Sequence, residues 1–197
     1  MIYAVDVEYT CFDSGHTGLF MANSIDAVEG VVFDAVIMMN LLEYIEDEVA
    51  FLNKLIQRVS AGGLLFFILP AFQFLYSKHD AYVKGLRRYN AAEFRKIIHL
   101  THGIEMTSCF YFYLSLFGIR AMKKLFHFPT DSNEKNLIRW KYPLKSPVTR
   151  FFVALLNTDF DLSRRMQSRR ARTPGLSLFA VCRHTPPAQG SGAENGE

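Results

Sequence analysis

The sequence is poor in cysteine and tryptophan, with three cysteines and one tryptophan among 197 residues. Cys11, Cys109 and Cys182 are widely spaced and form no C-x-x-C pair, which argues against a disulfide framework and against a cysteine-rich zinc site. The six histidines show no H-x-x-x-H or H-E-x-x-H spacing, so we expect no bound metal. The sparse cysteines favour a reducing compartment, and we therefore expect a cytoplasmic protein.

Long apolar runs and a strong excess of one charge are also lacking. The most apolar stretch, Cys109 to Ile119, is about half of the roughly 20 residues that a membrane-spanning helix needs. Met1 is followed at once by Ile-Tyr-Ala-Val-Asp, without the basic leader of a secretory signal. The net charge of +3 is too small to indicate a nucleic-acid partner. We expect a soluble protein, or at most one bound to a membrane surface.

The middle of the sequence instead predicts a strand, a helix and a second strand with short connections. Val31 to Met39 is a nearly continuous apolar run, typical of a strand covered on both faces. Apolar residues then recur at three- and four-residue spacing from Leu41 to Val59, as on one face of a helix. Glycines in Ala61-Gly62-Gly63 are expected to end this helix, and Leu64 to Leu69 predicts the next strand. This order is the signature of a parallel α/β sheet.

Further elements are predicted on both sides of this unit. Asn90 and Glu93 form a capping-box pattern for a helix that Gly103 closes. The remaining expected segments are strands at Ile2 to Val7, Leu19 to Ala22, Ile104 to Tyr113 and Gly175 to Arg183, helices at Leu114 to Phe128 and Val148 to Leu156, and a loop at Pro129 to Pro147. We expect one domain over residues 1–185 and a disordered tail over 186–197.

Two polar residues follow buried strands. Asp6 ends the first predicted strand, where a carboxylate can bind ribose hydroxyls or can simply be solvated. Asn40 ends the second buried strand, where its amide can contact a ligand or cap the following helix. The spacing alone leaves both alternatives open.

The segment after Leu69 is the most unusual. It carries the pair His79 and Asp80, then Arg87, Arg88 and Tyr89, with several aromatic residues between them. Loops that close over substrates follow strand ends in parallel sheets. His79 with Asp80 can act as a general base. The alternative is that His79 is a surface residue and that the arginines pair with nearby carboxylates.

Two segments have the composition of membrane-surface elements. The Arg164–Arg172 run carries five arginines in nine residues. Such a run can face anionic lipid or phosphate, or can be a solvated face. Leu114 to Phe128 combines an apolar face with lysines, as an interfacial helix does, or as a lid packed on the domain does.

Taken together, the segments FDAVIMMNLLEYIEDEVAFLNKL, AGGLLFFILPAFQFLYSKHDAYVKGLRRYNAAEF and PGLSLFAVCR resemble the class I S-adenosylmethionine (SAM)-dependent methyltransferases. More narrowly, they resemble the bacterial methyltransferase-domain proteins often encoded among cell-surface polysaccharide functions. The resemblance covers residues 31–110 and, less fully, 174–183. It implies a Rossmann-like methyltransferase sheet with a C-terminal helical excursion.

The resemblance also implies a cofactor and site residues. S-adenosyl-L-methionine would be held by Asp6 at the ribose, by Asn23 and Ser24 near the adenine, and by Asn40 and Leu41 beside its methionine part. The acceptor side would be lined by His79, Asp80, Arg87, Arg88 and Tyr89. The implied activity is methyl transfer to a small-molecule acceptor or to one linked to a lipid or sugar.

The sequence departs from the family pattern at several positions. Asn40, Tyr44, Ala61 and Leu86 stand where relatives usually have Asp, His, Pro and His. The family's first strand and its glycine-rich loop would precede Met1, so we expect an N-terminally truncated domain. The alternative function is a degenerate domain that binds no cofactor and acts as an interaction or membrane-surface module.

Overall fold

A computed structural model of the chain describes residues 2–5, 19–22, 28, 30–126, 146–168 and 173–186. The predicted site residues Asp6, Asn23 and Ser24, the arginines from 169 to 172 and the tail from 187 onward lie outside these ranges. The chain divides into two units, Met1–Phe33 and Asp34–Glu197.

The first unit contains two short parallel strands, β1 (Ile2–Val5) and β2 (Leu19–Ala22), in register from Ile2 opposite Leu19 to Val5 opposite Ala22. Both strands agree with the sequence prediction. Parallel strands need a connection longer than a hairpin turn, and 13 residues separate these two, from residue 6 to residue 18.

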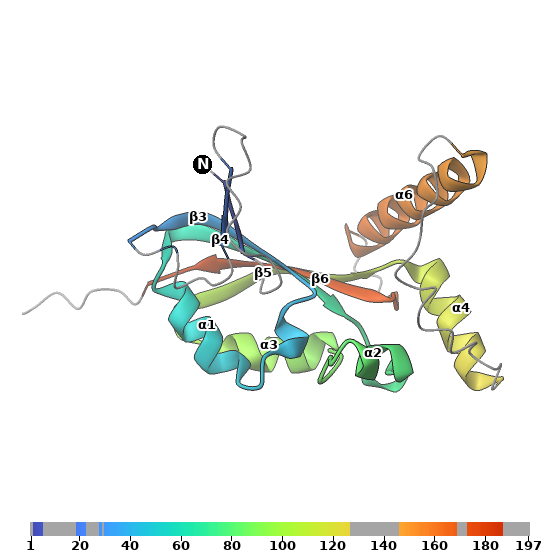
Figure 1. Ribbon diagram of the computed structural model, residues 1–197, viewed down its shortest axis with the longest axis horizontal. Coiled ribbons are helices and arrows are strands. Elements are labelled where there is room, and N and C mark those ends of the chain that lie inside the picture. Colours follow the sequence, from blue (N-terminus) through green and yellow to red (C-terminus); the bar gives the residue numbers. More distant parts are fainter. Residues whose placement is uncertain are drawn as a thin grey trace, which may run out of the picture. The chain divides into compact units, whose positions relative to one another are not determined.

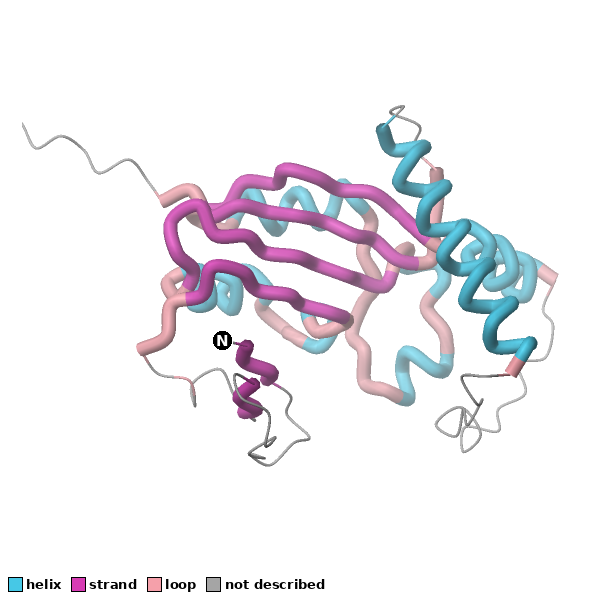
Figure 2. The backbone as a smooth tube through the Cα atoms, turned by 90° about the horizontal axis from the view of Figure 1, so that it is seen from above, coloured by secondary structure: helices cyan, strands magenta, loops and turns pink. Residues whose placement is uncertain are grey.

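The second unit is built on a four-stranded sheet in the order β3-β4-β6-β5 (Figures 1 and 2). Its strands are β3 (Phe33–Met39), β4 (Val59–Pro70), β5 (Ile104–Phe112) and β6 (Ser177–His184). Its helices are α1 (Glu48–Ile56), α2 (Lys78–Tyr82), α3 (Ala91–Leu100), α4 (Leu114–Leu125) and α6 (Pro147–Ser168), with short 3-10 helices η2 (Leu42–Tyr44) and η3 (Gln73–Leu75). The mixed sheet with helices is Rossmann-like and confirms the predicted α/β class.

β6 runs antiparallel to both of its neighbours, β4 and β5. Alternate residues of β4 and β6 are buried, including Leu65, Phe67 and Leu69 of β4 and Leu178 of β6, because successive side chains of a strand point to opposite faces. Figure 1 shows α1 and α3 on the same side of this sheet. Phe94 of α3 meets Phe67 edge to face, with ring centroids 5.0 Å apart. The core thus lies between the sheet and the α1–α3 pair.

The helix caps follow the sequence signals. Asn90 Oδ1 accepts hydrogen bonds from the backbone N of Ala92 and Glu93, both at 2.9 Å, and Glu93 Oε2 accepts from Asn90 N at 3.0 Å. At the start of α1, Asp47 Oδ1 accepts from Ala50 N at 2.9 Å. These side chains satisfy backbone donors that a helix start leaves unpaired.

Two details of the prediction were wrong. β3 is not covered on both faces: Ile37 and Met39, which share one face of the strand, are 66% and 63% exposed, whereas Met38 on the other face is 3% exposed. The helix does not run to the glycines either: α1 ends at Ile56, and Gly62 and Gly63 lie inside β4. Gly62 has φ +79, the left-handed conformation that glycine adopts easily. It takes this conformation within β4, near the start of the strand, and not at the end of a helix.

α6 is longer than predicted and extends through Ser168, so the basic run begins within this helix. Among the described residues, no helix is long and apolar enough to cross a membrane.

Candidate functional site

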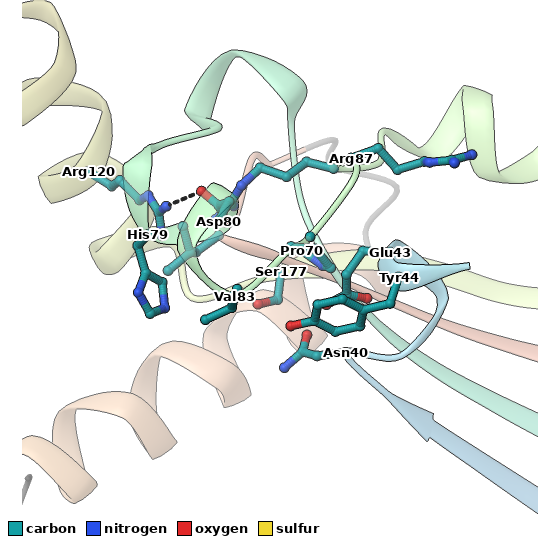
Figure 3. A pocket seen from close by; sticks show the side chains of 13 residues that line it. Asn40, Glu43, Tyr44, Pro70, His79, Asp80, Val83, Arg87, Arg120 and Ser177 are labelled. Carbon is teal, nitrogen blue, oxygen red and sulfur yellow. Dashed lines mark hydrogen bonds and ion pairs between the residues drawn. The ribbon is translucent and has the colours of Figure 1, made fainter. Parts of the chain in front are cut away.

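A pocket of about 230 Å³ opens where two strands of the sheet end and a third begins (Figure 3). β3 ends at Met39 beside Asn40, β4 ends at Pro70, and the antiparallel β6 begins at Ser177. The ends of β3 and β4 are held together by a hydrogen bond from Asn40 N to Ile68 O at 2.8 Å. In open α/β sheets, ligands bind outside the carboxyl ends of the strands. The pocket therefore lies where the fold places a ligand.

Its lining is rich in charged and polar side chains and comes from η2, α2, α4, the ends of β4 and β6, and the loops between them. The lining residues are Asn40, Glu43, Tyr44, Pro70, His79, Asp80, Val83, Gly85, Arg87, Arg88, Arg120, Leu176 and Ser177. The volume is below the roughly 300–1,000 Å³ of a typical small-molecule site, so the pocket suits one end of a ligand.

Asp80 organises one side of the pocket. Its Oδ1 accepts from Arg88 Nη2 at 2.5 Å, and its Oδ2 accepts from Arg120 Nη2 at 2.9 Å and from Ser77 N and Oγ, each at 2.7 Å. Burial by itself would raise the pKa of Asp80, but the hydrogen bonds from Arg88 and Ser77 lower it below its ordinary value. The carboxylate is thus held charged between two guanidinium groups.

Asp80 pairs with arginine and serine side chains and not with His79. Both Asp80 oxygens are engaged by arginine and serine donors, and His79 is exposed at the rim of the pocket. The alternative in which the arginines pair with nearby carboxylates describes the structure: Arg88 pairs with Asp80, and Arg87 pairs with Glu48 at 2.5 Å. Figure 3 shows the Arg87 side chain extending away from Asp80.

Tyr89 is not among the lining residues. Its side chain is 2% exposed, and its hydroxyl donates to Glu48 Oε1 at 3.3 Å. Burial, followed by the charge of Glu48, raises the pKa of its phenol. The main chain of this residue joins the loop to the sheet, since Tyr89 N donates to Pro70 O and Phe72 N donates to Tyr89 O, both at 2.9 Å. Tyr89 anchors the loop that carries the two arginines.

Asn40 and Leu41 are the predicted cofactor contacts that the structure describes. Asn40 is exposed, lines the pocket and has φ +46, a left-handed conformation that asparagine tolerates better than most residues. The α1 helix is capped by Asp47, so Asn40 does not serve as its cap. Leu41 precedes η2, is 36% exposed and does not line the pocket.

Glu43 is a site residue that the sequence prediction missed. It is 5% exposed, lines the pocket, and its Oε2 has no hydrogen-bond partner. Burial raises its pKa to about 7, against the lowering effects of a backbone hydrogen bond and of the Arg88 charge. Its place in the LEY sequence directly after a strand is the signal that could have identified it.

Arg120 was also missed, because it comes from a helix far along the chain. It donates to Ser77 Oγ at 2.8 Å as well as to Asp80, and so ties α4 to α2. Burial, followed by the nearby Arg88 charge, lowers the pKa of its guanidinium. Within the described ranges, no group of three or more His, Cys, Asp or Glu side chains could hold a metal ion.

Solved structures similar to this chain are methyltransferases. The plantazolicin methyltransferase BamL, solved with a triazolic desmethylPZN analog and SAH, is 14% identical, with a TM-score of 0.44 over 85% of this chain and 60% of that chain. A SAM-dependent methyltransferase from Archaeoglobus fulgidus is 11% identical, with a TM-score of 0.44 over 92% and 75%. Phosphoethanolamine N-methyltransferase 2 from Haemonchus contortus, solved with S-adenosyl-L-methionine, is 13% identical, with a TM-score of 0.36 over 78% and 33%.

No family model and no curated protein matches the chain. The chain spans 60% of the length of the plantazolicin methyltransferase. Because these TM-scores lie below 0.5, the likeness supports no conclusion about the activity of this chain.

Proposed function

We propose that this chain transfers a methyl group from S-adenosyl-L-methionine to a small-molecule or lipid-linked acceptor at the pocket between β3, β4 and β6. The observation that carries the proposal is the position of Asn40, which directly follows β3, lines the pocket and has an unusual positive φ. Backbone strain of this kind is found at ligand sites, where surrounding structure holds it in place.

Asn40 fits the methionine end of the cofactor. Its amide can donate to a carboxylate and accept from an ammonium group, and methionine offers both. The cofactor supplies an electrophilic methyl group on a sulfonium. The residues of the chain then have to place the acceptor in line with that methyl, because methyl transfer depends mainly on proximity and orientation.

Calorimetry with S-adenosylhomocysteine tests this function. We expect heat of binding from the wild-type chain, and an affinity about tenfold weaker for Asn40→Ala, because hydrogen bonds to charged groups are worth about 1.5 kcal/mol or more. Asn157→Ala is the matched control, since Asn157 is exposed on α6. A folded wild-type sample that gives no heat at high ligand concentration would exclude the proposed function.

A second candidate function rests on α4 and α6. Both helices expose large apolar side chains: Ile119, Met122, Leu125 and Phe126 at α4, and Phe151, Phe152, Val153, Leu155 and Leu162 on α6. Lys123, Lys124 and Arg150 lie beside them in the sequence. Apolar side chains flanked by basic ones are typical of a helix that binds the surface of an anionic membrane.

Flotation with vesicles separates this candidate from the first. Vesicles containing phosphatidylglycerol should carry the protein, and Phe151→Ser should reduce that fraction, whereas Tyr82→Ser on α2 should not. Equal flotation with neutral phosphatidylcholine vesicles would contradict an electrostatic contribution. Flotation without binding of S-adenosylhomocysteine would favour a membrane-surface module over an enzyme.

A further inference from the structure

Two buried polar atoms in the lining of the pocket lack hydrogen-bond partners. One is Oε2 of Glu43, whose residue is 5% exposed, and the other is Nε of Arg88, whose side chain is 4% exposed. The remaining nitrogens of Arg88 are used, since Nη1 donates to Ala71 O at 3.3 Å and Nη2 donates to Asp80. Buried polar atoms in native proteins are almost always paired, so an unpaired acceptor and an unpaired donor in one pocket indicate a bound group.

The chemistry of the two atoms restricts that group. Glu43 Oε2 needs a donor when its carboxyl group is ionised, and Arg88 Nε needs an acceptor. An ammonium group can satisfy the glutamate but repels the arginine. A carboxylate can satisfy the arginine but repels the ionised glutamate. A hydroxyl group satisfies both, because it has one donor hydrogen and two acceptor lone pairs.

We infer that Glu43 and Arg88 bind a hydroxyl group of the methyl acceptor, so that the product is a methyl ether. This inference rests on the proposed function and specifies the acceptor class of the same site. The hydroxyl donates to Glu43 Oε2 and accepts from Arg88 Nε. Glu43 lines the same pocket as Asn40 and Tyr44 (Figure 3), so the hydroxyl site shares that pocket with the position assigned to the cofactor's methionine end.

These residues account for each bond and for the proton in the methyl-transfer step. The hydroxyl oxygen forms a bond to the methyl carbon, and the bond between that carbon and the sulfonium sulfur breaks, leaving its electron pair on a neutral thioether. The hydroxyl proton moves to Glu43 Oε2. Glu43 is suited to receive it, because burial raises its pKa to about 7, and a base whose pKa lies near the working pH transfers protons efficiently.

Nuclear magnetic resonance titration with three small probes tests the inference. Phenol offers a hydroxyl group, anisole is the same molecule with that hydrogen replaced by methyl, and benzoate offers a carboxylate. We expect phenol to shift the Nε–H resonance of Arg88 and to bind at least tenfold more tightly than anisole, because anisole leaves Glu43 unpaired. Equal binding of phenol and anisole, or tighter binding of benzoate at about pH 8, would overturn the inference.

Variants identify the residue responsible. Glu43→Ala should weaken phenol binding about tenfold, and Glu46→Ala, at an exposed position three residues away, should leave it unchanged. In the wild type, phenol binding should strengthen from about pH 6 to about pH 8 as Glu43 ionises. Glu43→Gln keeps an acceptor oxygen and the fold but should lose this pH dependence. The titratable side chains of His79 and Tyr44 line the pocket in the wild type and in Glu43→Gln alike. A difference in pH dependence between these two proteins therefore comes from Glu43.

The outcomes distinguish failure of the hydroxyl site from failure of the proposed methyl transfer. Binding of S-adenosylhomocysteine without preferential binding of phenol would contradict the hydroxyl site and leave methyl transfer standing. Absence of S-adenosylhomocysteine binding would contradict the proposed function, whatever phenol does. Phenol binding that is identical in the wild type, Glu43→Gln and Glu43→Ala would remove Glu43 from the site.

Discussion

Arg88 donates from Nη2 to Asp80 Oδ1 at 2.5 Å, with only 4% of the arginine side chain and 13% of the aspartate side chain exposed. This ion pair joins α2 to the loop before α3, and Arg120 brings α4 to the same carboxylate. One acidic side chain thereby fixes three segments around the pocket.

We expect Asp80→Asn to lower the free energy of unfolding by about 3 kcal/mol, because removing one partner leaves the buried Arg88 charge uncompensated. Urea unfolding at neutral pH measures the loss. Asp161→Asn is the control: its pair with Arg164 is 3.9 Å long and exposed, so the change should stay within about 0.5 kcal/mol. Equal effects of the two substitutions would contradict the role of Asp80.

The same pair has a pH signature. The pKa of Asp80 is lower in the folded protein than in the unfolded chain, so its stabilisation is complete above about pH 4 and is lost as the pH falls further. Asp80→Asn should therefore flatten the acid side of the stability profile. An unchanged acid slope would show that the carboxylate is not held in its charged form.

Glu43 should act on stability in the opposite sense. Its folded pKa of about 7 lies above its ordinary value of 4.5, so the folded state keeps a proton that the unfolded chain has released. The free energy of unfolding should fall as the pH rises between these values, by about 3 kcal/mol in all. Glu43→Gln should remove this fall, and Glu46→Gln should not. Unfolding curves from about pH 5 to about pH 8 decide it.

Asp159 of α6 holds the start of α4. Its carboxylate accepts from the backbone N of Leu114 at 3.0 Å and of Ser115 at 2.9 Å, and from Ser115 Oγ. Asp159→Ala should cost about 1–2 kcal/mol and speed hydrogen exchange of the α4 amides, because the helix loses its N-terminal acceptor. Asp161→Ala, exposed on the same helix, should leave α4 exchange unchanged. The reverse pattern would contradict this contact.

Two glycines should respond in opposite directions to alanine. A Cβ on Gly175 would lie 2.3 Å from Phe112 O and 2.6 Å from Phe112 N, so Gly175→Ala should destabilise the protein by about 2 kcal/mol or more. A Cβ on Gly118 in α4 meets nothing within 4 Å, so Gly118→Ala should stabilise by about 0.5–1 kcal/mol. Thermal unfolding of both variants measures the difference, and a loss of stability in both would contradict the free space at Gly118.

The sequence alone determined most of the strands and the cap of α3, but not the end of α1 or the length of α6. The strand after Val31, the capping box at Asn90 and the strands beginning near Ile104 and Gly175 all follow from local patterns, because capping and apolar periodicity act over a few residues. Local patterns also singled out the segment from His79 to Arg88, four of whose predicted residues line the pocket, since loops after strand ends are placed by the strands themselves.

Only the tertiary structure decided which of those side chains are used, and how. It placed β3 at a sheet edge, buried Tyr89, and gave Asp80 to Arg88 and Arg120 rather than to His79. It also brought Glu43 into the pocket without a partner for Oε2. These outcomes depend on burial and on contacts between residues 8 to 40 positions apart. A periodic pattern predicts neither, because it reflects only residues within a few positions of one another.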